Sequence, residues 1–319
     1  MTVTDTVTDT VTPRTMTEDA TWHEMLDRLN RLSVDRHFDA YEDVAWDDPA
    51  YAIDPADARW ELPPDSPLGG TGWYREQPPE RRAEIGLFDV ASKMKVGLQF
   101  ENVLKRGLLE FALELPDRTP EFRFAYHELI EEAQHSLMFQ EFVNRAGLEV
   151  SGMAAWDKRA ARRIAKLGRR FPAAFFFFVL GGEDPIDHVQ REVLGSEREL
   201  HPLLERIMRI HVTEEARHLS FARNYLRRRV PALRWHRRQV LKVQVPVTLG
   251  VMAAMMLRPS PALVRRYGMP RRVLRQAYGT PEARAGVVAS LRKVRDLCDE
   301  LGLRTRGARR VWRVMGIDS

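Results

Sequence analysis

Two short motifs of the same spacing, Glu-x-x-His, stand in separate segments of this 319-residue chain. Glu132 and His135 lie in FAYHELIEEAQHSLMFQEF, and Glu215 and His218 lie in RIMRIHVTEEARHLSFARNYL. Three residues are nearly one helical turn, so each glutamate and its histidine leave the same face of a helix. Apolar residues surround both pairs, which indicates that these faces are buried. Two helices that each bury a carboxylate and an imidazole are typical of a helix bundle built around two metal ions.

Helical periodicity, interrupted by proline and glycine, divides the chain from about residue 80 onwards into helices. Long helices are expected at about 81–115, 120–146, 172–195 and 201–229, with a basic connector helix at about 154–170. Three or four shorter helices are expected over 232–319, and strand-like alternation persists nowhere. The chain is therefore predicted to be all-α, with a four-helix bundle at its centre.

The N-terminal part of the chain differs from the rest in composition. Residues 1–20 alternate Thr, Val and Asp, which is typical of a disordered tail, and 20–33 have the apolar spacing of a short amphipathic helix. Proline, aspartate and glycine make 35–80 an irregular arm, whose tryptophans and tyrosines indicate that it packs on the body. The predicted domains are a tail (1–20), the N-terminal helix and arm (21–80), the dimetal bundle (81–230) and a basic helical extension packed on it (231–319).

A dimetal bundle takes one further carboxylate from each of its two remaining helices. On the first long helix the candidates are Glu101, Glu110 and Glu114. Facing ligands of a hairpin should lie at similar distances from its turn, because both helices have the same rise per residue. The turn to the next helix lies near Asp117, and Glu101 precedes it by almost the same length of chain as Glu132 follows it. Glu101 is therefore predicted, whereas the other two glutamates are too close to the turn.

The same reasoning applies to the third long helix, where the candidates are Glu183 and Glu192. The following turn lies near Arg198, and Glu183 precedes it by nearly as much chain as Glu215 follows it. Glu192 lies much closer to this turn. Glu183 also directly follows the apolar run FFFFVLGG, as a ligand that projects into a dry core would. Glu183 is the predicted ligand, and Glu192 remains the alternative.

His211 precedes Glu215 by one helical turn and therefore points at the same site. The predicted metal ligands are Glu101, Glu132, His135, Glu183, His211, Glu215 and His218. Carboxylate oxygens mixed with imidazole nitrogens suit iron or manganese.

Other polar residues near these motifs are given smaller roles. His127, His188 and His201 are interpreted as surface groups or as supports of the ligands. Asp184 and Asp187 are interpreted as groups that orient a ligand histidine through its second ring nitrogen.

Charge and cysteine content limit the class of protein. Residues 227–319 hold 22 Lys and Arg against 5 Asp and Glu, although the whole chain carries only +5. This basic part would attract an acidic electron donor or an acidic carrier protein that holds the substrate, whereas nucleic acid and membrane are not expected as partners. The single Cys298 excludes an intrachain disulfide and, together with a start unlike a signal peptide, favours the cytoplasm. The longest apolar stretch, 243–257, is shorter than the ~20 residues of a membrane span and is interpreted as a buried helix.

In these motifs the chain resembles the diiron arylamine N-oxygenases, the p-aminobenzoate N-oxygenase family. The resemblance rests on QFENVLKRG, HELIEEAQHSLMF, LGGEDPIDHVQRE and RIHVTEEARHLSFAR, and it covers about residues 80–230. It implies a ferritin-like bundle with the same seven ligands, in which His211 takes the place of the family's third histidine. It also implies a homodimer, two irons, dioxygen as oxidant, and oxidation of an amine towards a hydroxylamine or nitro product.

The substrate pocket is expected about one turn from the ligands. Its predicted walls are Gly97, Leu98, Lys105, Phe176, Val179, Leu180, Leu219 and Ala222. Two alternatives to an arylamine N-oxygenase remain open. One is a diiron hydroxylase or desaturase of another organic substrate, and the other is a non-catalytic protein that binds or oxidises iron.

Overall fold

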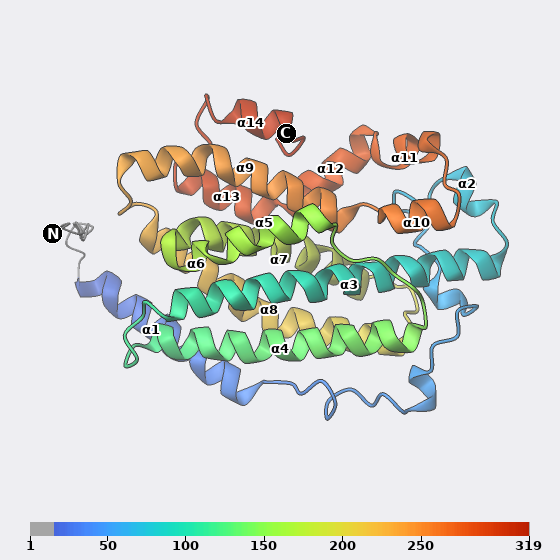
Figure 1. Ribbon diagram of the computed structural model, residues 1–319, viewed down its shortest axis with the longest axis horizontal. Coiled ribbons are helices and arrows are strands. Elements are labelled where there is room, and N and C mark those ends of the chain that lie inside the picture. The colour runs from blue at the N-terminus through green and yellow to red at the C-terminus, as the bar shows by residue number, and fades with distance from the viewer. Residues whose placement is uncertain (1–15, 319) are drawn as a thin grey trace.

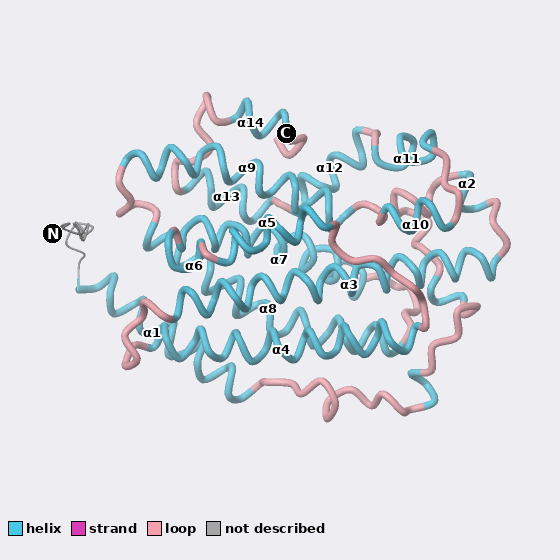
Figure 2. Tube along the Cα trace, viewed as in Figure 1, coloured by secondary structure: helices cyan, strands magenta, loops and turns pink. Residues whose placement is uncertain are grey.

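The computed structural model describes residues 16–318, and this part of the chain is all-α (Figure 1). Helices and loops alternate without any β-strand among the described residues (Figure 2). The first helix, α1 (Met16–Asp35), begins earlier than the predicted residue 20. The predicted disordered tail, 1–20, therefore overlaps this helix at residues 16–20. The remainder of the predicted tail, 1–15, lies outside the described part.

Four long helices form the bundle, and each begins with a proline. They are α3 (Pro79–Ala112), α4 (Pro120–Ala146), α7 (Pro172–Leu194) and α8 (Pro202–Arg229). Proline suits the first helical turn because its φ is already helical and no N–H is left unpaired there. The pairs α3–α4 and α7–α8 pack as hairpins (Figure 1), so residues from the middle of all four helices meet in one interior. The predicted ferritin-like helical bundle is confirmed.

The positions at which α4 begins and ends have local causes in the sequence. At its start Thr119 Oγ1 accepts a hydrogen bond from Phe122 N, which satisfies one of the free N–H groups of the first turn. At its end Gly147 adopts φ 63°, a left-handed conformation that glycine reaches without strain. The following connector is two helices rather than the single one predicted, α5 (Ala155–Ala165) and α6 (Leu167–Arg170). α6 crosses α3 in backbone contact, where a Cβ on Gly168 would lie 1.9 Å from Gly107 O.

The C-terminal part, as far as the structure describes it, contains six helices, more than the three or four predicted. They are α9 (Trp235–Leu257), α10 (Pro261–Arg266), α11 (Arg271–Tyr278), α12 (Pro281–Ser290), α13 (Arg292–Glu300) and α14 (Arg309–Val314). α9 packs along α7, and α12 and α13 also contact α7, so the extension covers the bundle on one side (Figure 1). The predicted number was too low because the chain also breaks at Leu291, where neither proline nor glycine marks the end of α12.

α9 is buried on one side only, so the prediction of a buried helix over 243–257 was half right. Leu241, Val245 and Leu249 are buried, whereas Val243 and Val247 on the other side are exposed. Within the described residues one helical stretch, Trp235–Arg266, is long and apolar enough to cross a membrane by length and composition. One face of α9 within this stretch packs against α7.

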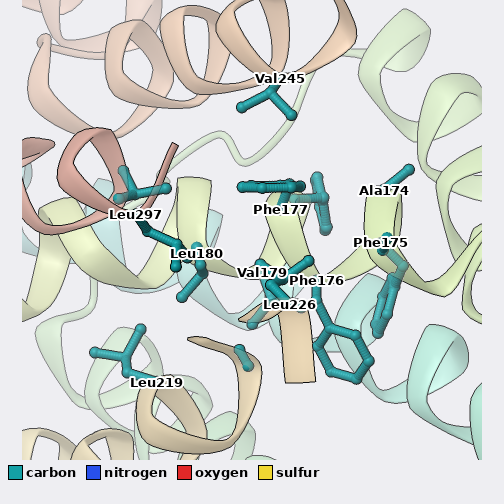
Figure 3. Packing of buried hydrophobic residues seen from close by; sticks show 14 of the residues in the cluster. Ala174, Phe175, Phe176, Phe177, Val179, Leu180, Leu219, Leu226, Val245 and Leu297 are labelled. Atoms are coloured by element: carbon teal, nitrogen blue, oxygen red, sulfur yellow. The ribbon is translucent and has the colours of Figure 1, made fainter. Parts of the chain in front are cut away.

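The largest hydrophobic core joins the bundle to the C-terminal helices. The phenylalanine run of α7 lies at its centre, between Leu219 and Leu226 of α8 and Val245 of α9 (Figure 3). Phe111, Phe176 and Phe221 form a set of edge-to-face contacts with centroids 5.1–6.3 Å apart. This dry packing occupies the end of the bundle next to the ligand residues.

The N-terminal arm lies along the outside of the bundle and contains short helices only. They are η1 (Pro49–Tyr51), η2 (Ala58–Trp60) and α2 (Gly72–Arg75). Trp60 is buried and stacks on His201, with ring centroids 4.3 Å apart. The arm is so close to α3 that a Cβ on Gly86 would lie 1.8 Å from Trp60 O.

Candidate metal centre

All seven predicted ligands point into one buried site at the middle of the bundle. α3 contributes Glu101, α4 contributes Glu132 and His135, and α7 contributes Glu183. α8 contributes the remaining three. Each of the seven side chains is at most 3 % exposed. Their nitrogen and oxygen atoms form overlapping groups of three within 4.8 Å of one another, among them Glu101 with His135 and His211, Glu132 with His135 and Glu215, and Glu183 with His211 and Glu215.

The two Glu-x-x-His pairs meet across the interface of α4 and α8. His218 Nδ1 lies 3.1 Å from Glu132 Oε1 and 3.1 Å from Glu215 Oε1. His135 Nδ1 lies 3.6 Å from Glu132 Oε2 and 3.7 Å from Glu215 Oε1. Both glutamates therefore face both histidines, so that each carboxylate could share a metal ion with either histidine.

The alternative carboxylates lie away from this cluster. Glu110 is paired with Arg169 at 3.2 Å, and Glu114 is exposed beyond the end of α3. Glu192 has a side chain 68 % exposed and lies 3.3 Å from His188 on the surface of α7. Of the carboxylates weighed on these two helices, only Glu101 and Glu183 reach the interior with the other five residues.

Two further glutamates hold the outer nitrogens of the histidines. His135 Nε2 lies 2.9 Å from Glu214 Oε2, and His218 Nε2 lies 2.7 Å from Glu131 Oε2. Each bond crosses between α4 and α8, so each helix orients the histidine of the other. A hydrogen bond to the outer nitrogen fixes the ring and leaves Nδ1 directed inward.

Arg217 joins the two outer glutamates. Its Nη2 lies 2.8 Å from Glu131 Oε1 and 3.5 Å from Glu214 Oε1, and the side chain is buried. Burial favours the neutral form of Glu131, but hydrogen bonds with His218 and Arg217 outweigh it and lower the pKa to about 2. Glu131 is therefore ionised, as an acceptor for a ligand histidine should be. Glu131, Glu214 and Arg217 were not predicted from the sequence.

His211 is oriented by a different partner. Its Nδ1 lies 2.9 Å from Gln190 Oε1, while its Nε2 lies 3.9 Å from both Glu101 Oε1 and Glu215 Oε1. Burial, and then the neighbouring His135, lower the pKa of His211 to about 4. The ring is neutral, and because Nδ1–H donates to the amide oxygen, the lone pair of Nε2 is directed into the site.

The residues present fit a pair of metal cations. Glu101 Oε2, Glu215 Oε2 and both carboxylate oxygens of Glu132 are buried without a hydrogen-bond partner among the described residues. Burial, followed by the charge of Glu215, raises the pKa of Glu183 well above its ordinary value. Burial disfavours the charged form of His135, but the carboxylates of Glu132 and Glu214 outweigh it and raise the pKa to about 10. The carboxylates thus attract positive charge, which protons supply in part and divalent metals would supply in full.

Comparison with known proteins places the chain in a family. Residues 19–302 match the family model described as p-aminobenzoate N-oxygenase AurF. The chain belongs to the p-aminobenzoate N-oxygenase family. This family is part of the diiron ferritin-like superfamily. Uncharacterized protein Rv0885 of Mycobacterium tuberculosis and uncharacterized protein Mb0909 of Mycobacterium bovis are each 40% identical to it over 302 residues, 94% of this chain and 89% of theirs.

Several polar residues of this N-oxygenase family member lie elsewhere than predicted. Asp184 is paired with Arg223, and Asp187 with Arg191 at 2.7 Å, so neither aspartate orients a ligand histidine. The groups that hold the outer nitrogens of these histidines are glutamates of α4 and α8, whereas the two aspartates lie on α7. His201 is no surface group, since it is fully buried under the arm, where Nε2 lies 3.2 Å from Ala52 O.

A cavity of about 2060 Å³ extends to the ligand residues. Its inner walls include Glu101, Glu183 and His211, together with Gly97, Phe100, Phe139, Gly182 and Ile186. The outer walls come from the arm, the end of α9 and the helices α10 to α12. The cavity therefore lies between the predicted ligand residues, the N-terminal arm and the C-terminal extension.

The predicted pocket residues lie mostly outside this cavity, and Gly97 alone of the eight lines it. Leu98 packs at the edge of a second core cluster. Lys105 donates to Glu132 O at 3.1 Å and to Ser136 Oγ. The other five are core residues: Phe176, Val179, Leu180, Leu219 and Ala222. The prediction took the wrong end of the bundle, because the phenylalanine run fills the space that it assigned to substrate.

Proposed function

We propose that this protein is a diiron oxygenase that uses O2 to oxidise an amine, by N-oxygenation of an arylamine to a hydroxylamine or nitro product. The observation that carries the proposal is the convergence of four glutamates and three histidines in a buried site at the wall of a large cavity. Membership of the p-aminobenzoate N-oxygenase family supports the class of reaction. The ligand set we propose is the predicted one: Glu101, Glu132, His135, Glu183, His211, Glu215 and His218.

The protein's part in this chemistry is to hold charge and exclude water. Two irons would supply the activation of O2 and the electrons for its reduction. Four carboxylates would offset the charge of two divalent ions. Glu132 lies beside His218 of the opposite motif, and Glu215 lies beside His135. Phe100 and Phe139, next to the ligands in the cavity wall, would keep water from the reacting amine.

The cavity would place the substrate on one side of the centre. Glu101, Glu183 and His211 line it, whereas Glu132, His135 and His218 do not. The amine nitrogen would therefore meet the centre on the side of His211. Gly182 packs against the ring of Phe100 and Gly97 against the ring of Phe139, so two aromatic rings form the cavity wall beside the ligands.

A combined metal and product analysis tests the proposal. Purified protein should contain two irons per chain, and reduced protein supplied with O2 and an arylamine should form hydroxylamine or nitro product. Protein that binds iron but leaves a panel of arylamines unchanged would contradict the N-oxygenase assignment. Protein without affinity for iron or manganese would contradict the dimetal centre itself.

A second function, hydroxylation or desaturation of another organic substrate, is favoured by one observation. The cavity of about 2060 Å³ is well above the roughly 300–1,000 Å³ of sites for drug-sized ligands, and much larger than a single aromatic ring needs. Incubation with an arylamine and with a long-chain acyl substrate, followed by product analysis, separates the two functions.

The partners we propose follow from charge and family. An electron donor must reduce the irons, and the basic residues of 227–319 would bind an acidic donor or an acidic carrier protein that holds the substrate. We also propose a homodimer located in the cytoplasm. Light scattering measures the mass of the assembly, and a cage of many subunits would favour an iron-storage function instead.

A further inference from the structure

The two metal-binding helices carry the same pattern, but one of its positions has no role in the proposed ligand set. On α8 the inward residues are His211, Glu215 and His218, spaced by four and three. On α4 Glu132 and His135 have the same spacing, and four residues before Glu132 stands Glu128. Glu128 therefore occupies on α4 the position that His211 occupies on α8.

The hydrogen bonds of the centre follow the same correspondence. Glu131 precedes Glu132 as Glu214 precedes Glu215, and each of these outer glutamates holds the histidine of the opposite helix. The correspondence thus covers four positions on each helix. It differs in chemistry only at the first, where a carboxylate stands in place of an imidazole.

Glu128 is buried and lies against the ligands. Its side chain is 1 % exposed, and it forms a group with Glu132 and His218 whose ligand atoms lie within 4.8 Å of one another. This is the only one of the four such groups that includes neither His135 nor Glu215, among the residues that the structure describes. The carboxylate therefore faces the His218 side of the centre, whereas His211 faces the His135 side.

Neither oxygen of Glu128 has a hydrogen-bond partner in the described part of the chain. The neighbouring Glu131 is equally buried, but it bonds to His218 and is ion-paired with Arg217. A buried carboxyl group without a partner costs folding free energy, because it loses its bonds to water and gains none. A metal cation beside Glu132 and His218 would supply the missing partner.

We propose that Glu128 is an eighth protein ligand of the dimetal centre, bound to the metal on the side of His218. The inference rests on the dimetal centre proposed above and extends its ligand set to five glutamates and three histidines. One metal would then be held on a nitrogen-rich side, near Glu101, His135 and His211. The other would be held on an oxygen-rich side, near Glu128, Glu132 and His218.

Metal binding by the wild-type protein and by Glu128→Gln tests this assignment. Metal-free protein is titrated with Co²⁺, whose optical spectrum reports the ligands, and the bound metal per chain is measured. Wild type should bind two ions, while Glu128→Gln should bind one of them about 10-fold or more weakly, with a changed spectrum for that ion alone. Glu205→Gln, on the outer side of α8, is the matched control and should bind as wild type does.

Thermal unfolding separates a ligand from a residue that merely supports the fold. Substitution removes no hydrogen bond of Glu128, so metal-free Glu128→Leu should unfold at the same or a higher temperature than metal-free wild type. The increase in Tm on adding Co²⁺ should be smaller in the variant. A structural role would instead lower the Tm of metal-free and metal-bound protein alike.

A crystal structure of the wild-type protein with Co²⁺ bound gives an answer that needs no variant. A Glu128 oxygen at ligand-bond distance from one ion supports the proposal. Two ions bound without Glu128, or unchanged affinity and spectrum in Glu128→Gln, would overturn it and leave the seven-ligand centre standing. Wild type that binds no metal would overturn both.

Discussion

His218 Nε2 lies 2.7 Å from Glu131 Oε2, although the two residues belong to different helices of the bundle. His135 and Glu214 form the reciprocal bond at 2.9 Å. The two helices that carry the Glu-x-x-His motifs therefore depend on each other for the orientation of their histidines. Neither motif is complete on its own helix, and this makes the geometry of the centre sensitive to the packing of α4 against α8.

Replacing Glu131 with glutamine tests this dependence. The amide cannot accept as strongly from His218 as the carboxylate does, and it leaves Arg217 without its closest charge partner. We expect about 10- to 100-fold weaker metal binding, while the helical content is unchanged. Titration of metal-free protein, with circular dichroism as the fold control, measures both. Metal affinity equal to that of wild type would show that the His218 ring is fixed by packing alone.

The third histidine is tested by His211→Ala, which leaves both Glu-x-x-His pairs in place. We expect the variant to keep two metal sites, because His135 and His218 retain their outer partners. The rate of N-oxygenation per bound iron should fall at least about 10-fold, since His211 lines the cavity beside the reacting centre. Iron content and product formation are measured on the same sample. An unchanged rate per iron would remove His211 from the reaction and leave it a role in binding only.

Gly182, next to Glu183, is tested by Gly182→Ala. A Cβ there would lie 2.2 Å from Phe100 Cζ, so the ring beside Glu101 would have to move. We expect a loss of about 1–3 kcal/mol in the free energy of unfolding, as for other overpacked cores, together with weaker metal binding. Chemical denaturation measures the first quantity. Gly286→Ala is the control, because nothing lies within 4 Å of its Cβ, and this change should be neutral or slightly stabilising.

Lys105 makes the stability of the fold depend on pH. Burial lowers its pKa to about 8 from the ordinary 10.5. Between these values the unfolded chain binds more protons than the folded one, so this residue's contribution to stability rises with pH from about 8 to 10.5. The charged amine costs about 1–2 kcal/mol at pH 7, with allowance for its partial exposure.

Comparison with Lys105→Met isolates this effect. The variant lacks the charge, so wild type should gain stability relative to it as the pH increases from 8 to 10. Urea denaturation at several pH values gives the difference in the free energy of unfolding. A difference that stays constant over this range would mean that Lys105 keeps its ordinary pKa in the folded protein.

The bundle could be predicted from sequence because its determinants are local. Prolines at the start of the four long helices, and glycines after α4 and α7, fixed these boundaries to within a few residues. The spacing of the two motifs indicated the shared interior. The distance argument along each hairpin selected Glu101 and Glu183, and both lie in buried groups with His211, because equal numbers of residues cover similar lengths of helix. It needed no knowledge of side-chain packing.

The pocket and the supporting residues depend on packing between distant segments, and the sequence does not state this directly. Phe176 and Leu180 are as apolar as a pocket wall would be, and only the neighbours of α7 decide that they fill a core instead. The outer glutamates did leave a signal. EEAQH and EEARH share a glutamate before each motif, and a comparison of the two segments would have drawn attention to Glu131 and Glu214.

The buried arginine of the centre also reaches the N-terminal arm. Arg217 Nη2 lies 3.1 Å from Arg36 O, and Phe38 N donates to Glu214 Oε1 at 3.1 Å. The backbone just after α1 is thus bonded to the same groups that hold the ligand histidines. Metal loading and the anchoring of this segment should therefore stabilise each other, so that the rate at which a protease cuts near residue 37 would report how fully the centre is occupied.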